Sequence, residues 1–310
     1  MTKIPSSPSP FADRGPNDII ILDGGMGTTL EDNGADLAHP LWSAHMLRQD
    51  AQLVRDVHDA FLGAGADVIS TCTYQASFEG FARNGITPDA GADLMRTAVT
   101  IARASADAAQ LDGRQRWVAG SCGPYGAMLN DGSEFTGAYS VPHDELVEFH
   151  LRRARILVDA GVDFLAFETV PQLAEIRAIH DALDQLDAWA WISVQAQNEN
   201  QMASGTSVVA ALVAAGAHER VFAVGCNCTH PMYVNNILNA ARHVVDKPFV
   251  VYPNFGRTWD SASMSWLGTG VHFDHAQAAT WIELGARFIG GCCGVGPALI
   301  NELAKQLRQP

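Results

Sequence analysis

The sequence contains no apolar run long enough to cross a membrane and no block of basic residues. A membrane-spanning helix needs roughly 20 consecutive apolar residues, and no stretch of this chain approaches that length. The formal net charge is -14, and an acidic surface disfavours contact with nucleic acid or anionic membranes. We therefore expect neither nucleic acid nor a membrane as a partner.

The sequence also lacks a signal peptide pattern and a dinucleotide-binding loop. Residues 1–17 are rich in Ser and Pro without the apolar centre of a signal peptide, so we expect a flexible tail and, by default, a cytoplasmic location. The glycines that follow the first apolar run, Gly24, Gly25 and Gly27, do not have the spacing of a dinucleotide-binding loop. That spacing excludes a nucleotide-binding fold of the Gly-x-Gly-x-x-Gly type.

What the sequence does contain is a regular alternation of apolar runs and amphipathic or Ala-rich stretches. Eight runs have the length and composition of strands: Ile19–Leu22, Asp67–Ser70, Trp117–Gly120, Phe164–Phe167, Ala190–Val194, Phe222–Cys226, Phe249–Tyr252 and Phe288–Gly291. Helical stretches follow them, at about 48–63, 91–110, 143–160, 172–186, 206–216, 232–244, 274–284 and 297–308. Eight such units predict an α/β fold, a closed (β/α)₈ TIM barrel with residues 18–310 as its single domain.

Polar residues follow the predicted strands at their carboxyl ends. They are Asp23, Thr71, Ser121, Glu168, Gln195, Asn227 with Cys228, Asn254, and Cys292 with Cys293. A parallel barrel places these strand ends at one rim, where the active sites of barrel enzymes lie. We therefore expect these side chains to converge on one mouth.

Three of the six cysteines are expected at that mouth. Cys292 and Cys293 lie on a glycine-rich turn, and Cys228 follows the sixth strand, close enough around the barrel to share a point with them. Three thiolates with an open fourth position are typical of a catalytic zinc that accepts a substrate ligand, and sulfur favours Zn²⁺ over Mg²⁺ or Ca²⁺. Ordinary buried cysteines, or a vicinal disulfide between Cys292 and Cys293, are the alternatives.

Two neighbours of Cys228 complicate this cluster. Cys226 lies two residues earlier, so strand alternation predicts that it shares the face of Cys228 one layer deeper in the barrel, where core packing is its expected role. His230 offers a Cys-x-Cys-x-His alternative in the turn before Pro231.

Two carboxylates are candidates for substrate contact. Asp23 opens a tight glycine-rich turn that brings it close to a small ligand, and a carboxylate at this entrance would repel phosphate. Glu168 follows the fourth strand, either as a partner for a substrate ammonium group or as a solvated rim charge. Trp259 and Trp266, after the seventh strand, are expected either to shield the site from water or to pack within their loop.

Taken together, these residues resemble the zinc-dependent homocysteine S-methyltransferases, a family that includes betaine-homocysteine methyltransferase and the homocysteine-binding module of methionine synthase. The resemblance runs from about residue 19 to 296. The matching segments are Asp23–Thr28, Leu41–Ala44, Thr73–Ser77, Gly120–Gly126, Asp131–Glu134, Ala166–Pro171, Gly225–Pro231, Tyr252–Asn254 and Gly290–Gly294. The branch that uses S-methylmethionine or S-adenosylmethionine as methyl donor is the most similar.

The resemblance implies a role for each site residue. The family's zinc ligands, which are its catalytic residues, fall on Cys228, Cys292 and Cys293. Its contacts to the homocysteine amino group fall on Asp23 and Glu168. The carboxylate-binding turn falls on the segment from Thr71 to Gln75, which gives Thr71, Tyr74 and Gln75 as substrate-binding residues.

The implied activity is methyl transfer from a sulfonium donor to homocysteine, forming methionine. A free thiol with a pKa near 8.5 is only a few per cent thiolate at neutral pH, and zinc would supply the thiolate. The partners are then small molecules, with a homo-oligomer as a further expectation. Alternatives are betaine as donor, selenohomocysteine as acceptor, a zinc hydrolase on the same barrel, and a barrel that binds thiols or zinc without catalysis.

Four positions depart from the family pattern. Phe255-Gly256-Arg257 stands where Ser-Gly-Glu is usual, Thr29 where Glu is common, Ser204 where Asp is common, and Cys226 where Val or Ile is common. We expect the first three to lie in loops that shape the donor pocket. A lost carboxylate and a gained Arg257 would disfavour a cationic donor, so the departures bear on the donor more than on the acceptor.

Overall fold

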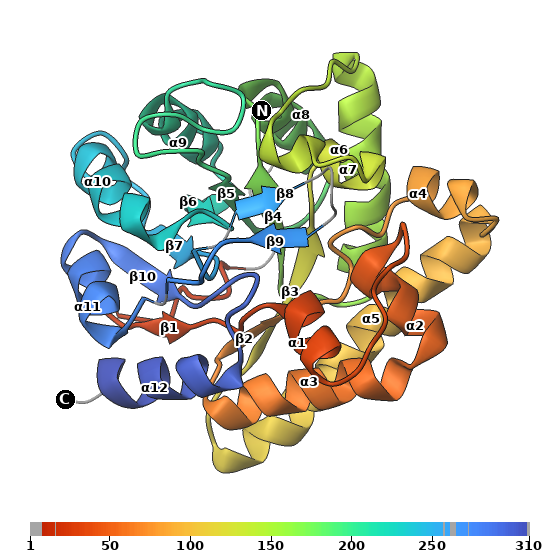
Figure 1. The fold of residues 1–310 in the computed structure, drawn as a ribbon, viewed down its shortest axis with the longest axis horizontal. Coiled ribbons are helices and arrows are strands. Elements are labelled where there is room, and N and C mark those ends of the chain that lie inside the picture. The colour runs from red at the N-terminus through yellow and green to blue at the C-terminus, as the bar shows by residue number, and fades with distance from the viewer. Residues whose placement is uncertain (1–7, 16, 257, 261–264, 272, 309–310) are drawn as a thin grey trace.

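A closed barrel of parallel strands forms the centre of the structure, with helices around it (Figure 1). The computed structural model describes residues 8–15, 17–256, 258–260, 265–271 and 273–308. The barrel strands are β1 (Ile20–Ile21), β2 (Val68–Ser70), β3 (Trp117–Cys122), β4 (Phe164–Val170), β5 (Ala190–Val194), β6 (Val221–Asn227), β7 (Phe249–Tyr252) and β10 (Ala286–Ile289). Each overlaps a strand predicted from the sequence, which confirms the (β/α)₈ barrel.

A long helix follows each barrel strand and returns the chain to the amino end of the barrel. These helices are α3 (Ala51–Ala64), α5 (Pro88–Ala109), α7 (His143–Asp159), α8 (Leu173–Leu183), α9 (Val208–Gly216), α10 (Pro231–Ala241), α11 (His275–Glu283) and α12 (Pro297–Leu307). Local chemistry fixes their ends. The Leu53 N–H donates to Asp50 Oδ1 (3.0 Å) at the start of α3, and Gly65 ends that helix with φ 108°.

Shorter elements occupy the connections after the strands. They are α1 (Met26–Asp32), η1 (Trp42–His45), α2 (Met46–Gln49), α4 (Phe78–Arg83), η2 (Gln110–Asp112), α6 (Tyr125–Leu129) and η3 (Ser133–Phe135), together with a hairpin of β8 (Thr258–Asp260) and β9 (Ser265–Leu267). The hairpin is the reason that the eighth barrel strand is β10. No helix in the described residues is long and apolar enough to span a bilayer.

The ring of strands closes between β1 and β2. Leu22 forms a parallel bridge with Val68, and the Asp23 N–H donates to the Val68 carbonyl (3.0 Å). The other neighbours pair in the order β1-β10-β7-β6-β5-β4-β3-β2. Closure places all eight carboxyl ends on one rim, so residues distant in sequence meet there.

The apolar core has two layers. The larger layer lies between the strands and the helices and contains residues such as Ile192, Val224 and Ile237. The smaller layer fills the barrel interior with residues such as Trp117, Phe164 and Trp191, all buried. A filled interior confines ligand binding to the rim.

Phe11 closes the amino end of this interior. Its ring centroid lies 4.7 Å from Trp117, 5.6 Å from Phe164, 5.3 Å from Phe222 and 4.9 Å from Phe288. Aromatic pairs at these separations are attractive beyond the area that they bury. The Ser- and Pro-rich composition of residues 1–17 did not predict this contact.

We predict that Phe11→Ala lowers the free energy of unfolding by about 2–3 kcal/mol, because it removes a half-buried ring from four aromatic contacts. Urea denaturation measures this change. The control, Asp13→Ala, alters an exposed residue of the same segment and should stay within about 0.5 kcal/mol of the unsubstituted protein. Equal stability of the two variants would show that Phe11 contributes nothing.

Candidate active site

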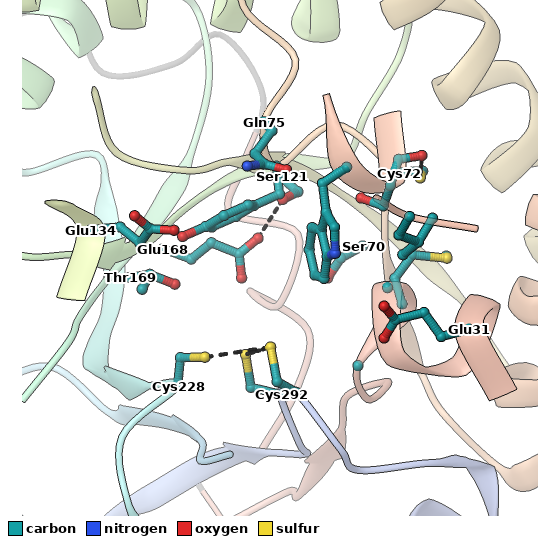
Figure 2. Close-up of a pocket in the computed structure, with 18 of the residues that line it drawn as sticks. Glu31, Ser70, Cys72, Gln75, Ser121, Glu134, Glu168, Thr169, Cys228 and Cys292 are labelled. Atoms are coloured by element: carbon teal, nitrogen blue, oxygen red, sulfur yellow. Dashed lines mark hydrogen bonds between the residues drawn. The ribbon is translucent and has the colours of Figure 1, made fainter. Parts of the chain in front are cut away.

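A cavity of about 890 Å³ opens at the carboxyl rim of the barrel, and residues from several strand ends line it (Figure 2). All eight residues predicted as site residues are among its lining: Asp23, Thr71, Tyr74, Gln75, Glu168, Cys228, Cys292 and Cys293. Ser121, which was also predicted to converge on this mouth, lines the cavity with them, whereas Gln195, Asn227 and Asn254 are not among the lining residues.

Three thiols lie together in this cavity. The Sγ atom of Cys293 lies 3.6 Å from that of Cys228 and 4.0 Å from that of Cys292. All three sulfurs lie within 4.8 Å of one another, and none is in a disulfide. The vicinal disulfide between Cys292 and Cys293 is therefore not formed in this structure.

The backbone leaves the strand conformation at both ends of the cluster. Cys228 has φ 47°, which is rare outside glycine and directs its side chain away from the strand alternation. The Phe255 N–H donates to the Cys293 carbonyl (2.9 Å) and the Cys292 N–H donates to the Pro253 carbonyl (2.8 Å). The chain after β7 thus holds the turn after β10 in place.

The prediction that Cys226 shares the face of Cys228 is wrong. Cys226 is fully buried in the layer between the strands and the helices, and its pKa is raised to about 12 by that burial. Because β6 ends at Asn227 and Cys228 has a positive φ, the alternation does not continue between the two cysteines. His230 instead accepts a hydrogen bond from the Met232 N–H (3.2 Å) at the start of α10, and it is not part of the sulfur cluster.

The buried amide of Asn227 connects the cluster to two other strand ends. Its Oδ1 accepts from the Thr169 N–H (2.6 Å) and from the Ser193 hydroxyl (2.7 Å). Its Nδ2 donates to Thr169 Oγ1 (2.8 Å) and, more weakly, to Cys292 Sγ (3.9 Å). Tyr252, whose hydroxyl lies 2.6 Å from Ser193 Oγ, extends this network to β7.

Asp23 is buried beside the start of the turn after β2. Its Oδ2 accepts from the Ser70 N–H (2.7 Å) and its Oδ1 from the Ser70 hydroxyl (3.3 Å). Burial raises its pKa to about 7, against the opposing effect of these hydrogen bonds. No Lys or Arg is among the described residues that line the cavity with this carboxylate.

Glu168 is the second buried carboxylate. It belongs to β4 and accepts a hydrogen bond from the Ser121 hydroxyl at the end of β3. Burial raises its pKa to about 8, and the Ser121 hydrogen bond opposes that shift. Its predicted alternative as a solvated rim charge is wrong, because only 8% of the residue is exposed.

The turn after β2 is held by hydroxyl groups. Thr71 Oγ1 lies 2.7 Å from Thr73 Oγ1 and accepts from the Ser121 N–H (3.0 Å). Gln75 donates its amide to the Ala127 carbonyl (3.2 Å), while its Oε1 is buried without a hydrogen-bond partner among the described residues. Thr71 thus supports the loop, whereas the Gln75 side chain keeps hydrogen-bonding capacity.

Sequence reasoning assigned no role to two residues that line the cavity, Trp42 and Glu134. Trp42 has φ 43°, and its ring lies so close to Gly27 that a Cβ there would be 2.2 Å from Trp42 Cζ2. Glu134 is buried, and its Oε2 has no hydrogen-bond partner in the described structure. Both belong to segments quoted for the family resemblance, but their burial and backbone angles are not readable from residue type.

The expected effect of the sequence departures on the cavity is not found for the described residues. Thr29 lies within α1 rather than in a loop, and neither Thr29, Ser204 nor Phe255 is among the cavity-lining residues. Arg257 lies outside the described residues, as do the side chains of Trp259 and Trp266, although these two residues pair across the β8–β9 hairpin.

The cavity is acidic. Its described lining includes the carboxylates Asp23, Glu31, Asp36, Glu134 and Glu168, but no Lys or Arg. Buried carboxylates without cationic partners are costly, which is consistent with the raised pKa values of Asp23, Glu134 and Glu168. An electrostatic environment of this kind favours cationic ligands.

We predict that Asn227→Ala lowers the free energy of unfolding by about 2–4 kcal/mol, because it leaves the buried Thr169 N–H and Ser193 hydroxyl without their acceptor. Thermal and urea denaturation measure the loss. Asn236→Ala, at an exposed position of α10, is the matched control and should change stability by less than about 0.5 kcal/mol. If N227A is as stable as N236A, the network does not hold the rim together.

Comparison with curated proteins gives relatives that align over nearly the whole chain. The homocysteine S-methyltransferase YbgG of Bacillus subtilis is 38% identical over 298 residues, which cover 94% of this chain and 95% of the relative. A selenocysteine methyltransferase of Astragalus bisulcatus is 37% identical, with 93% and 92% covered.

Comparison with solved structures gives the same result. The homocysteine methyltransferase MmuM from Escherichia coli, crystallised in a metallated form, has a TM-score of 0.84 and 34% identity, covering 95% of this chain and 97% of its own. The family model of homocysteine S-methyltransferases matches residues 20–307. The chain therefore belongs to the homocysteine S-methyltransferase family.

Proposed function

We propose that this protein transfers a methyl group from a sulfonium donor, S-methylmethionine or S-adenosylmethionine, to the sulfur of homocysteine and so forms methionine. The observation that carries the proposal is the meeting of three thiols and two buried carboxylates in one cavity. Family membership and the names of the relatives support homocysteine as the acceptor.

Cys228, Cys292 and Cys293 are proposed to hold a zinc ion. The donor set fits: three sulfurs lie within 4.8 Å of one another, and sulfur ligands favour zinc over hard cations. The metallated form of the related MmuM structure supports metal binding by this protein. A bound zinc ion would act as a Lewis acid and favour the thiolate form of a substrate thiol.

Asp23 and Glu168 are proposed to bind the ammonium group of homocysteine. Both carboxylates are buried, and an ammonium group beside them would supply the missing positive charge and lower the pKa of each. The turn from Thr71 to Gln75 is proposed to contact the substrate carboxylate, with the amide of Gln75 and the hydroxyl of Tyr74 on the cavity wall.

The methyl-transfer step depends on the relative orientation of the two substrates more than on proton transfer. The homocysteine thiolate forms a bond to the donor methyl carbon while the bond from that carbon to the donor sulfur breaks. The electron pair of the broken bond remains on the donor sulfur, which becomes a neutral thioether. No general base acts in this step, so the cavity contributes by holding the two sulfurs in line.

A cationic donor suits the cavity. Its described lining has five carboxylates and no Lys or Arg, and the ring of Trp42 is edge-on to that of Tyr74 with centroids 6.4 Å apart. Carboxylates and aromatic faces both attract onium groups. A selenol is a second candidate acceptor, because the 37%-identical Astragalus relative is a selenocysteine methyltransferase.

We predict that Cys293→Ala loses its zinc and its methyl-transfer activity together, because it removes one of three sulfur ligands. Metal analysis after zinc loading and dialysis should give about one zinc ion per chain in the unsubstituted protein and little in the variant. The control is Cys226→Ala, which changes a buried cysteine outside the sulfur cluster and should retain zinc. A C293A protein that keeps both zinc and activity contradicts the assignment.

The proposed function is tested by a donor screen. Zinc-loaded protein and homocysteine are incubated with S-methylmethionine, S-adenosylmethionine or betaine, and methionine is quantified. We expect methionine with at least one sulfonium donor, because the acidic cavity favours a cation. Zinc bound without methionine formation from any of the three donors would refute the proposal, and ester or amide hydrolysis by the same sample would favour a zinc hydrolase.

A further inference from the structure

Glu134 is held rigidly at the wall of the cavity, opposite the sulfur cluster. It lies in the short helix η3, whose N-cap is Gly132 at φ 82°. Just before this helix, Asp131 Oδ1 accepts a hydrogen bond from the Ser133 N–H (2.9 Å). Gly126 packs directly against this helix, since a Cβ on Gly126 would lie 2.6 Å from the Glu134 nitrogen. The backbone of Glu134 therefore has little freedom to move.

The carboxylate of Glu134 is buried without a charged partner. Only 8% of the residue is exposed, its Oε2 has no hydrogen-bond partner, and no ion pair involves it in the described part of the chain. Burial raises the pKa of this carboxyl group to about 7, and a hydrogen bond from its own backbone N–H lowers the pKa in the opposite direction. A buried carboxylate aimed into a cavity without a protein partner fits a positively charged ligand.

The position of Glu134 suits the donor rather than the acceptor. Figure 2 shows Glu134 on the same side as Glu168 and Thr169, facing Cys228 across the cavity. Asp23 and Glu168 already serve the ammonium group of homocysteine in the proposed function, which leaves Glu134 for a second cation.

We propose that Glu134 is a specificity-determining residue that binds the positive charge of the methyl donor. The inference rests on the proposed function and deepens it, because it assigns the recognition of the onium charge to one side chain. In this arrangement the Glu134 carboxylate faces the sulfonium charge of the donor, which exists only before the methyl group is transferred. Once the methyl group has moved, the donor is a neutral thioether and its attraction to Glu134 is lost.

This role has a kinetic signature. The donor carries its full positive charge in the ground state and only part of it in the transition state, so a carboxylate beside it stabilises the bound donor more than the transition state. Removing the carboxylate should therefore raise KM for the donor and leave kcat unchanged or slightly higher. A residue that only maintains the fold would not separate these two constants.

The experiment compares the sulfonium donor with an isostere that lacks only the sulfonium charge. Steady-state rates at saturating homocysteine give KM for S-methylmethionine and the inhibition constant Ki for homoleucine, in which a CH group replaces the sulfonium sulfur. Both are measured for zinc-loaded full-length protein, for Glu134→Gln and for Glu219→Gln. E219Q is the matched control, since it removes the same charge from an exposed position outside the cavity.

We expect E134Q to raise KM for S-methylmethionine by about tenfold or more, because it removes a buried negative charge that attracts the sulfonium group, and a tenfold change corresponds to about 1.4 kcal/mol. Its Ki for homoleucine, its kcat and its KM for homocysteine should stay within about twofold of the unsubstituted values, as should every constant of E219Q. Unchanged KM for homocysteine also shows that the variant folds.

Three outcomes would overturn the assignment. An unchanged KM for S-methylmethionine in E134Q means that Glu134 does not bind the donor. An equal rise in the homoleucine Ki means that Glu134 binds a part that both molecules share, such as the α-ammonium group, and not the sulfonium charge. A rise in KM for homocysteine instead places Glu134 in the acceptor site. Failure of the unsubstituted protein to use any sulfonium donor refutes the proposed function itself, and the role of Glu134 with it.

Discussion

The side-chain amide of Asn227 is the contact on which the carboxyl rim of this barrel depends. Its oxygen and nitrogen together bond to residues of β4 and β5 and reach the sulfur of Cys292 after β10. A buried amide can satisfy all its hydrogen bonds only when these strand ends stand in one relative position. The same contact therefore positions the strand that carries Glu168 and the turn that carries two of the three clustered thiols.

Charge organises the space above this rim. Closure of the barrel brings acidic side chains from separate strand ends and loops to one cavity, and burial raises the pKa of Asp23, Glu134 and Glu168. Such an arrangement is unfavourable in the protein alone and becomes favourable when cations enter. The fold thus creates an electrostatic preference for positively charged groups beside the cluster of three thiols.

The sequence predicted the fold well because the barrel is encoded by local periodicity. Eight apolar runs with helical stretches between them can be recognised from local composition alone, and each run corresponds to an observed strand. It failed where the backbone departs from regular structure. Alternation placed Cys226 beside Cys228, whereas the positive φ of Cys228 turns the two side chains to different layers. The contacts of Phe11 with four strands were equally invisible, because they join residues far apart in the chain.

The sequence by itself determined the eight-unit barrel, the rim on which its polar residues meet, and the family to which its motifs belong. Only the tertiary structure decided which of those residues are buried, which are paired and which are left without a partner. Asp23 and Glu168 each have a hydroxyl donor, whereas Oε2 of Glu134 has no hydrogen-bond partner among the described residues. Residue type and spacing cannot convey this difference, because desolvation and hydrogen bonding arise from neighbours that only the closed barrel brings together.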